Sequence, residues 1–135
     1  MKNALRRRIT PFVPFSMTVE DADGGKFEVH FKLAFDFNSY ALFEEKTGLS
    51  VLTGGAFGKP SARNTLVLLW AAVQIYQPEY AGDTGLSAIG SMLSLDMAPA
   101  AVAAVEAAFL ASLPKGRLEE LEAAGGETPN VQSAK

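Results

Sequence analysis

Two short runs of alternating apolar and polar residues, separated by a turn, constrain the fold of this chain more than any other feature. The runs lie at residues 15–20 and 26–33, and a period of two is the pattern of a half-buried strand. Residues 21–25, Asp-Ala-Asp-Gly-Gly, are typical turn formers, because aspartate bonds its own backbone and glycine adopts positive φ. We therefore predict a β-hairpin over residues 12–34.

The hairpin requires an additional layer to be stable. Pro11 and Pro14 cannot donate to a strand ladder, so the first strand should lie at an edge or start late. Two strands alone are marginally stable in water. The hairpin is therefore expected to pack its apolar face against helices.

Capping residues and hydrophobic periodicity predict those helices. Asn38 and Ser61 are candidate N-caps, and Gly48 is a candidate left-handed C-cap. The helices are expected at residues 38–48, 61–77, 86–93 and 95–113. The chain is thus expected to be α+β and mainly helical, with the N-terminal hairpin packed on a small bundle of about four helices.

Two of these helices carry more apolar surface than one small core needs. Residues 61–77 are apolar on every side of the helix, which places that helix in the middle of a core or at a partner surface. Residues 95–113 combine an apolar stripe with a smooth alanine face. Either all of this surface closes the core, or part of it forms a groove for a partner helix or for self-association.

Length and composition favour a single globular domain over residues 12–113, within a chain of 135 residues. Residues 1–11 are basic and expected to be flexible, and the polar residues 114–135 are expected to be mostly disordered. The net charge of −3 disfavours nucleic-acid binding, although the basic N-terminus could dock on an acidic partner or a nucleic acid.

The sequence contains few groups that could form a catalytic or metal-binding site. The chain has no cysteine and one histidine, His30, which excludes thiolate sites and sites that need two imidazoles. Asp21 and Asp23 lack the remaining ligands of a calcium loop. Residues 54–61 mimic a phosphate-binding loop, but a proline separates the lysine from the serine. We expect no catalytic residue, no metal and no cofactor.

No segment is expected to cross a membrane, since the strongest apolar run, residues 66–75, is far shorter than the roughly 20 residues a spanning helix needs. The basic start of the chain is followed by prolines rather than by an apolar stretch, so it does not read as a signal peptide. The expected compartment is the cytoplasm.

The order of motifs resembles a known family. Residues 33–48, LAFDFNSYALFEEKTG, resemble the strand-to-helix entry of tail assembly chaperones from long-tailed bacteriophages and gene transfer agents. A glycine-rich linker, the helix start at residues 61–72, the Gln-Pro-Glu of residues 77–79 and a short helix at 89–93 follow in the family's order. The resemblance covers about residues 27–113. It departs from the family at residues 80–86, where the helix start is looser.

The resemblance implies a function. Such chaperones bind the tape measure protein, a long helical and aggregation-prone chain, and keep it soluble until tail tube subunits polymerise around it. They are absent from the finished virion. Many are made in two lengths by a ribosomal frameshift, and this chain would be the short form. The alternatives are a structural tail-completion or connector protein of a phage or prophage, a small regulatory protein that touches nucleic acid, and an enzyme.

Large apolar side chains are the expected contacts with the tape measure protein or with another chaperone copy, since aromatic anchors carry most of the binding energy at such surfaces. A core position is favoured for Phe37 and Trp70. The candidate partner-binding residues are Phe37, Tyr40, Phe43, Trp70, Val73 and Tyr76.

Overall fold

A computed structural model describes residues 10–53 and 61–113 of the chain. The expectations for residues 1–9, for the 54–60 linker and for the 114–135 tail lie outside the described residues. The described part contains a two-stranded antiparallel hairpin followed by four α-helices, which confirms the mainly helical α+β class. The elements are β1 (Val13–Glu20), β2 (Lys26–Leu33), α1 (Phe37–Thr47), α3 (Ala62–Val73), η1 (Pro78–Tyr80), α4 (Gly82–Met92), η2 (Leu95–Met97) and α5 (Ala98–Ser112).

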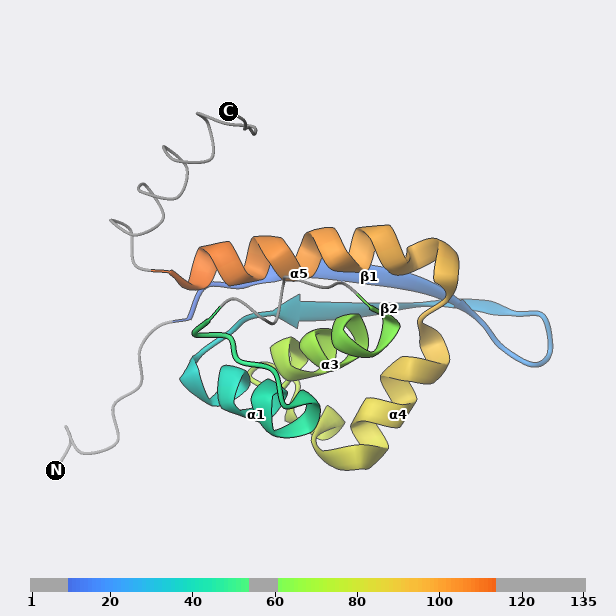
Figure 1. The fold of residues 1–135 in the computed structure, drawn as a ribbon. Helices are drawn as coiled ribbons and strands as arrows, with labels where there is room; N and C mark the ends of the chain where they lie inside the picture. Colours follow the sequence, from blue (N-terminus) through green and yellow to red (C-terminus); the bar gives the residue numbers. More distant parts are fainter. Residues whose placement is uncertain (1–9, 54–60, 114–135) are drawn as a thin grey trace, which may run out of the picture.

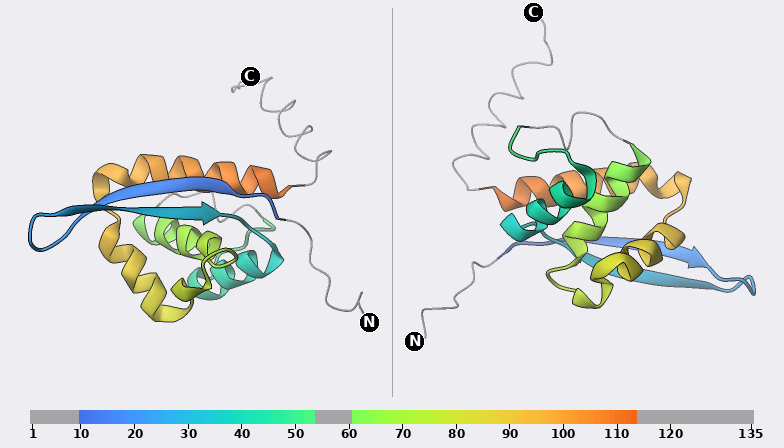
Figure 2. Two further views of the ribbon diagram at one scale, coloured as in Figure 1. Left: turned by 180° about the vertical axis from the view of Figure 1, so that it is seen from behind. Right: turned by 60° about the horizontal axis from the view of Figure 1, so that its bottom comes forward.

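The helices cover one face of the hairpin. In Figure 1, α5 runs along β1, and α3 lies in the centre between the hairpin and the pair α1 and α4. The view from behind shows the opposite face of the hairpin uncovered (Figure 2). In all views the turn between the strands projects beyond the helices.

The hairpin follows the alternation in the sequence. Phe15 pairs with Phe31 and Met17 with Val29 in an antiparallel register, and all but the half-buried Val29 of these four are buried against the helices. In the turn, the Asp21 carboxylate accepts from two backbone N–H groups, and Gly24 has a φ of 84°. Local turn chemistry and the apolar row together therefore fix the register.

The first helix begins earlier than expected. Its N-cap is Asp36 rather than Asn38, because the Asp36 carboxylate accepts from the Ser39 N–H at 3.0 Å. The Asp36 N–H in turn donates to the Ser39 hydroxyl at 3.1 Å, which completes a capping box. The end of the helix agrees with expectation, since Gly48 adopts the left-handed conformation with a φ of 76°.

The central helix α3 is surrounded by the rest of the fold. Every residue from position 67 to its end is buried, so of the two positions that its uniform apolarity allows the helix takes the one in the core. Ser61 caps its start through a bond from the Asn64 N–H. The helix ends at Val73 rather than at residue 77, because the chain turns there and brings the side chains of Tyr76 and Gln77 to the hairpin.

The helix α4 also begins earlier than predicted. The glycines at residues 82–85 were expected to interrupt the structure before a helix at 86–93, but α4 starts at Gly82. Gly85 lies inside this helix and is buried. An added Cβ there would lie 1.7 Å from the Tyr80 carbonyl oxygen. The glycine is thus required for the close approach of α4 to the segment before it, which a local pattern does not reveal.

The last helix, α5, begins at Ala98 after the short η2 turn, three residues later than expected, with Pro99 in its first turn. Together η2 and α5 correct one expectation about the sequence. The 18 residues Leu95–Ser112 have a mean hydropathy of 1.4, which is long and apolar enough, by length and composition, to cross a membrane. A single helix of this kind is weak evidence for a membrane span.

Candidate binding surfaces

Three of the six candidate partner-binding residues are part of the core. Phe43, Trp70 and Val73 are at most 1% exposed. A partner of the folded protein cannot reach these side chains, so their expected contact role is replaced by a packing role. The core position favoured for Trp70 is confirmed.

Trp70 anchors the centre of the core through its polar edge as well. Its indole nitrogen donates to the Tyr80 carbonyl oxygen at 2.8 Å, and Gln74 Nε2 donates to the same oxygen at 3.0 Å. Lys46 Nζ lies 5.7 Å from the centre of the Trp70 ring. A buried indole needs such a partner, so Trp70 holds the η1 turn against α3.

Tyr40 is half-buried and joins α1 to α5. Its ring stacks on Phe35 with centroids 5.2 Å apart, and it meets Phe109 edge-on at 6.0 Å. Its hydroxyl bonds with the Ser112 hydroxyl at the end of α5. These contacts assign Tyr40 mainly to the packing of the two helices.

Phe37 and Tyr76 are the exposed candidates. The Phe37 side chain is 72% exposed at the first position of α1, which corrects the core position favoured from the sequence. Phe35, before the Asp36 N-cap, and Phe43, within α1, are buried, whereas Phe37 in the first turn lies outside. Phe37 is accessible to a partner as it stands.

Tyr76 belongs to an exposed aromatic pair with Phe12, a residue that the sequence did not single out. It meets Phe12 edge-on with ring centroids 5.3 Å apart, and Lys32 Nζ lies 5.0 Å from the Phe12 ring and 5.7 Å from the Tyr76 ring. These side chains border a hollow of about 390 Å³ on the uncovered side of the hairpin. Strand parity could have found part of this group, since Pro14 pairs with Lys32 and Phe12 lies two residues before Pro14.

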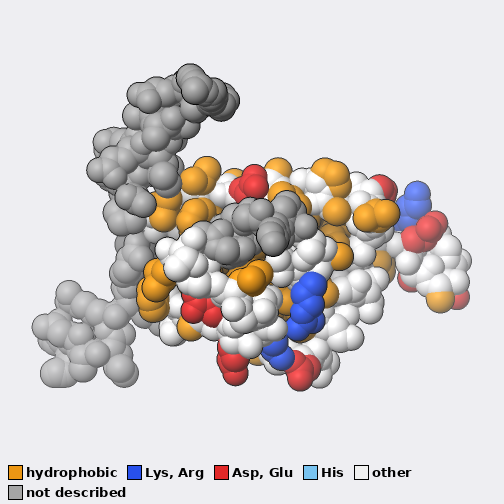
Figure 3. Space-filling model, viewed as in Figure 1, with side chains coloured by type: hydrophobic (Ala, Val, Ile, Leu, Met, Phe, Trp, Pro, Cys, Tyr) orange, Lys and Arg blue, Asp and Glu red, His pale blue; other side chains and the backbone are white. Residues whose placement is uncertain are grey.

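One side of α5 is an exposed and mostly apolar surface. We define the α5 outer face by its exposed positions, which apart from Glu106 are apolar. Only Ala101, Val105 and Ala108 of α5 are buried. Hydrophobic side chains therefore remain visible along α5 in Figure 3. The outer face comprises Pro99, Ala100, Ala103, Glu106, Ala107 and Leu110.

Polar groups on the uncovered sheet face form a line but not a closed site. The Ser16 hydroxyl bonds with His30 Nδ1 at 2.7 Å, and His30 Nε2 lies 3.5 Å from a Glu28 carboxylate oxygen. The His30 and Glu28 side chains are 69% and 61% exposed. A serine nucleophile needs an oriented base in a site that excludes water, so this line supports no nucleophilic chemistry. Within the described ranges no three candidate ligands come together for a metal ion.

One carboxylate has a perturbed pKa, for a structural reason. Lys46 on α1 bonds with Asp83 on α4 at 2.5 Å. The hydrogen bond and the positive charge of Lys46 lower the pKa of the Asp83 carboxyl below its usual value. The pair is exposed on the Asp83 side, so it links two helices at the surface rather than marking a catalytic site.

Comparisons with protein-family models, with curated proteins and with solved structures find no match for this chain.

Proposed function

We propose that this protein is a phage tail assembly chaperone that binds the tape measure protein and keeps it soluble until the tail tube polymerises around it. The observation that carries the proposal is the α5 outer face. Apart from Glu106 and Ser112 every residue of α5 is apolar, yet only 17% of the Leu95–Ser112 stretch is buried. A helix that is apolar on all sides is ordinarily covered on all sides.

The chemistry of this face suits a helical client. Ala100, Ala103 and Ala107 lie at spacings of three and four and form a flat strip with exposed Leu110 at one end. Small side chains let a second helix approach closely, and an amphipathic helix docks by laying its apolar side along such a strip. A long helical chain that has not yet been enclosed by tube subunits would present apolar stripes of this kind.

Exposed aromatic residues would supplement the strip. Phe37 and the Phe12–Tyr76 pair supply large apolar contact area away from α5. Aromatic anchors of this type carry a large share of the binding energy at protein interfaces. A client that is much longer than one chaperone could engage several such areas.

The remaining parts of the proposal follow from the family resemblance. The chain would act in the host cytoplasm as a non-virion factor, without a cofactor and without catalysis. Its partners would be the tape measure protein, a frameshifted longer form of itself, tail tube subunits and further copies of the same chain. Neither nucleic acid nor a membrane would be a partner.

Co-purification from cells that make both proteins tests the proposal. The tape measure protein of the same genome is co-expressed with tagged wild-type chaperone, with an Ala103→Glu and Ala107→Glu double variant, and with Ala88→Glu. Ala88 is an exposed alanine of α4 and provides the matched control. We expect the wild type and the control to retain the client and the double variant to lose most of it. Equal retention by all three would exclude the α5 outer face as the docking site.

A further inference from the structure

The outer edges of β1 and β2 differ in whether a side chain bonds with their outward main-chain groups. The Gln77 side chain accepts from the Lys32 N–H at 2.9 Å and donates to the His30 carbonyl oxygen at 3.1 Å. Its amide therefore takes the place of a neighbouring strand at the His30–Lys32 end of β2. This strand also carries Lys26 and Lys32, and lysines are one of the means by which proteins keep a strand edge from pairing.

The edge of β1 has no such protection. In an antiparallel pair, the residues whose N–H and C=O point outward alternate with those that pair across the ladder. Since His30 and Lys32 point outward on β2, their cross-strand partners Ser16 and Pro14 point outward on β1, and Thr18 and Glu20 follow. Within the described residues, no group bonds with the main chain of residues 16, 18 or 20. Lysine is absent from β1, and Pro14 removes a donor at one end only.

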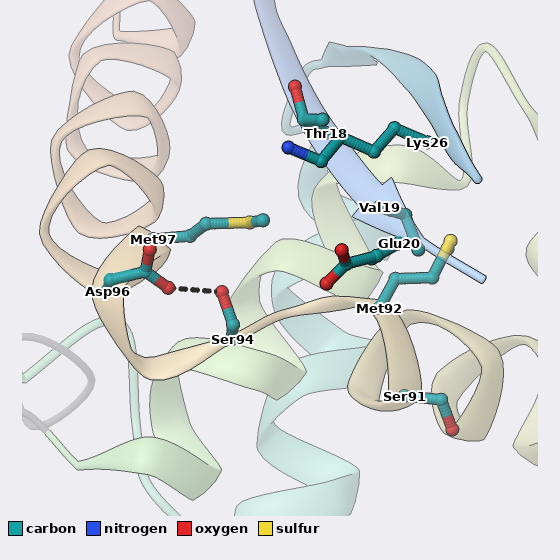
Figure 4. Close-up of a pocket in the computed structure, with 9 residues that line it drawn as sticks. All are labelled: Thr18, Val19, Glu20, Lys26, Ser91, Met92, Ser94, Asp96 and Met97. Atoms are coloured by element: carbon teal, nitrogen blue, oxygen red, sulfur yellow. Dashed lines mark hydrogen bonds between the residues drawn. The ribbon is translucent and has the colours of Figure 1, made fainter. Parts of the chain in front are cut away.

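The open edge borders a groove. A hollow of about 480 Å³ lies between β1 and the turn from α4 to α5, beside Thr18, Val19 and Glu20. Figure 4 shows the Met92 and Met97 side chains directed into this hollow, with the bonded pair Ser94 and Asp96 on the side opposite β1. Because the hairpin projects beyond the helices at this end (Figure 1), an extended chain can approach the edge along its length.

We propose that this edge binds β1 of a second copy of the chain. The two β1 strands would pair antiparallel about a two-fold axis at Thr18, so that two hairpins join into one four-stranded sheet. In this register Ser16 of each copy faces Glu20 of the other and Thr18 faces Thr18. The outward N–H and C=O groups of these residues then form about six backbone hydrogen bonds. Pro14 lies outside the paired region.

The polar side chains along β1 suit a second copy in this orientation. The edge carries an acid, Glu20, at the turn end, with Asp96 across the groove. Toward its other end, Ser16 bonds with the imidazole of His30 at 2.7 Å. Antiparallel pairing about Thr18 places the Glu20 carboxylate of each copy beside the Ser16–His30 pair of the other. The two Glu20 carboxylates thus lie at opposite ends of the interface, each beside hydrogen-bonding groups of the other copy rather than beside a second carboxylate.

A single cysteine tests this register, because the natural chain has none. In the proposed dimer the two copies of residue 18 are adjacent, with Cα atoms about 5.5 Å apart, which a disulfide can span. Thr18→Cys in the full chain should therefore form a covalent dimer under mild oxidation. Glu28→Cys is the matched control, since Glu28 pairs directly with Thr18 but lies on the opposite edge of the hairpin. Little crosslinking at position 18, or equal crosslinking at both positions, would overturn the proposal.

Light scattering on the purified full chain provides the second measurement. The wild type is expected to have twice the mass of one chain, and Thr18→Pro to have the mass of one chain. Neither Thr18→Pro nor Glu28→Pro removes a bond within the hairpin, because both N–H groups point outward. Glu28→Pro should stay dimeric, and far-UV circular dichroism checks that both variants fold. A monomeric wild type, including one that binds an extended peptide at this edge, would exclude the second copy. This result is independent of whether a tape measure protein binds.

Discussion

Trp70 and Tyr80 meet through one hydrogen bond, from the indole nitrogen to the backbone carbonyl oxygen at 2.8 Å. The bond joins the buried helix α3 to the η1 turn, and Gly85 of α4 packs directly against the same carbonyl. Three segments that are separate in the sequence therefore meet at one backbone oxygen.

Substituting Gly85 should disrupt this meeting point. In Gly85→Ala the new Cβ would lie 1.7 Å from the Tyr80 oxygen, which backbone movement must relieve. We expect a loss of about 3 kcal/mol in the free energy of unfolding. Chemical denaturation measures it. Gly90→Ala in the same helix meets only the flexible Leu66 side chain at 3.3 Å, so it should change stability by less than about 1 kcal/mol. A Gly85→Ala variant as stable as the wild type would contradict the packing.

The N-cap of α1 can be tested by a pair of alanine substitutions. Asp36→Ala removes the carboxylate that accepts from the Ser39 N–H, and should lower the free energy of unfolding by about 1 kcal/mol. Asn38→Ala removes a side chain that does not cap the helix, and should be nearly neutral. A larger loss of stability for Asn38→Ala than for Asp36→Ala in thermal or urea unfolding would indicate that Asn38 is the cap.

The Lys46–Asp83 pair should produce a small acid sensitivity. Because the folded-state pKa of Asp83 is lowered, its contribution to stability is present above the pKa of the unfolded chain and is lost as the pH falls through the folded value. Asp83 is exposed, so the effect is small. In an NMR titration, Lys46→Met should raise the Asp83 pKa toward 3.8. Lys46→Arg, which keeps the charge, should leave it lowered. An Asp83 pKa that does not respond to Lys46→Met would contradict the ion pair.

Removing the Gln77 amide should expose the outer edge of β2 near His30 and Lys32. Gln77→Ala deletes the groups that bond with Lys32 and His30, and these bonds contribute about 1 kcal/mol each. We expect unfolding to require about 1–2 kcal/mol less free energy, and the variant to aggregate more readily on concentration, because an unpaired edge is open to pairing. Gln77→Glu keeps an acceptor for Lys32 but not a donor for His30, so it should be intermediate. Unchanged stability and solubility in both variants would show that the amide does not protect the edge.

Local signals predicted the parts of the fold that local chemistry determines. The hairpin follows from alternation and from the aspartates and glycines of its turn, and the burial of α3 follows from its uniform apolarity. The start of α4 could not be predicted locally, because glycine usually indicates a break in a helix. In the structure Gly85 lies inside α4, where its lack of a side chain makes room for the Tyr80 carbonyl group. The end of α3 depends likewise on contacts that Tyr76 and Gln77 make with the hairpin.

The binding residues were harder to predict than the fold. The predicted contacts are large apolar residues. The residue type alone does not distinguish a buried side chain, such as Phe43 or Trp70, from an exposed one, such as Phe37. Phe37 is the first residue of α1, and its side chain is 72% exposed there. The sequence predicts the alanine side of α5, whereas the exposure of that side depends on which stripe of the helix packs against the core.

The soluble fraction of the tape measure protein tests the central proposal most directly. The protein is expressed alone, with the wild-type chain, and with the Ala103→Glu and Ala107→Glu double variant, and its soluble and pelleted amounts are compared. A chaperone of the proposed kind should move most of the tape measure protein into the soluble fraction, and the double variant should not. If the tape measure protein stays in the pellet with the wild-type chain present, or is soluble without it, the chaperone proposal is contradicted.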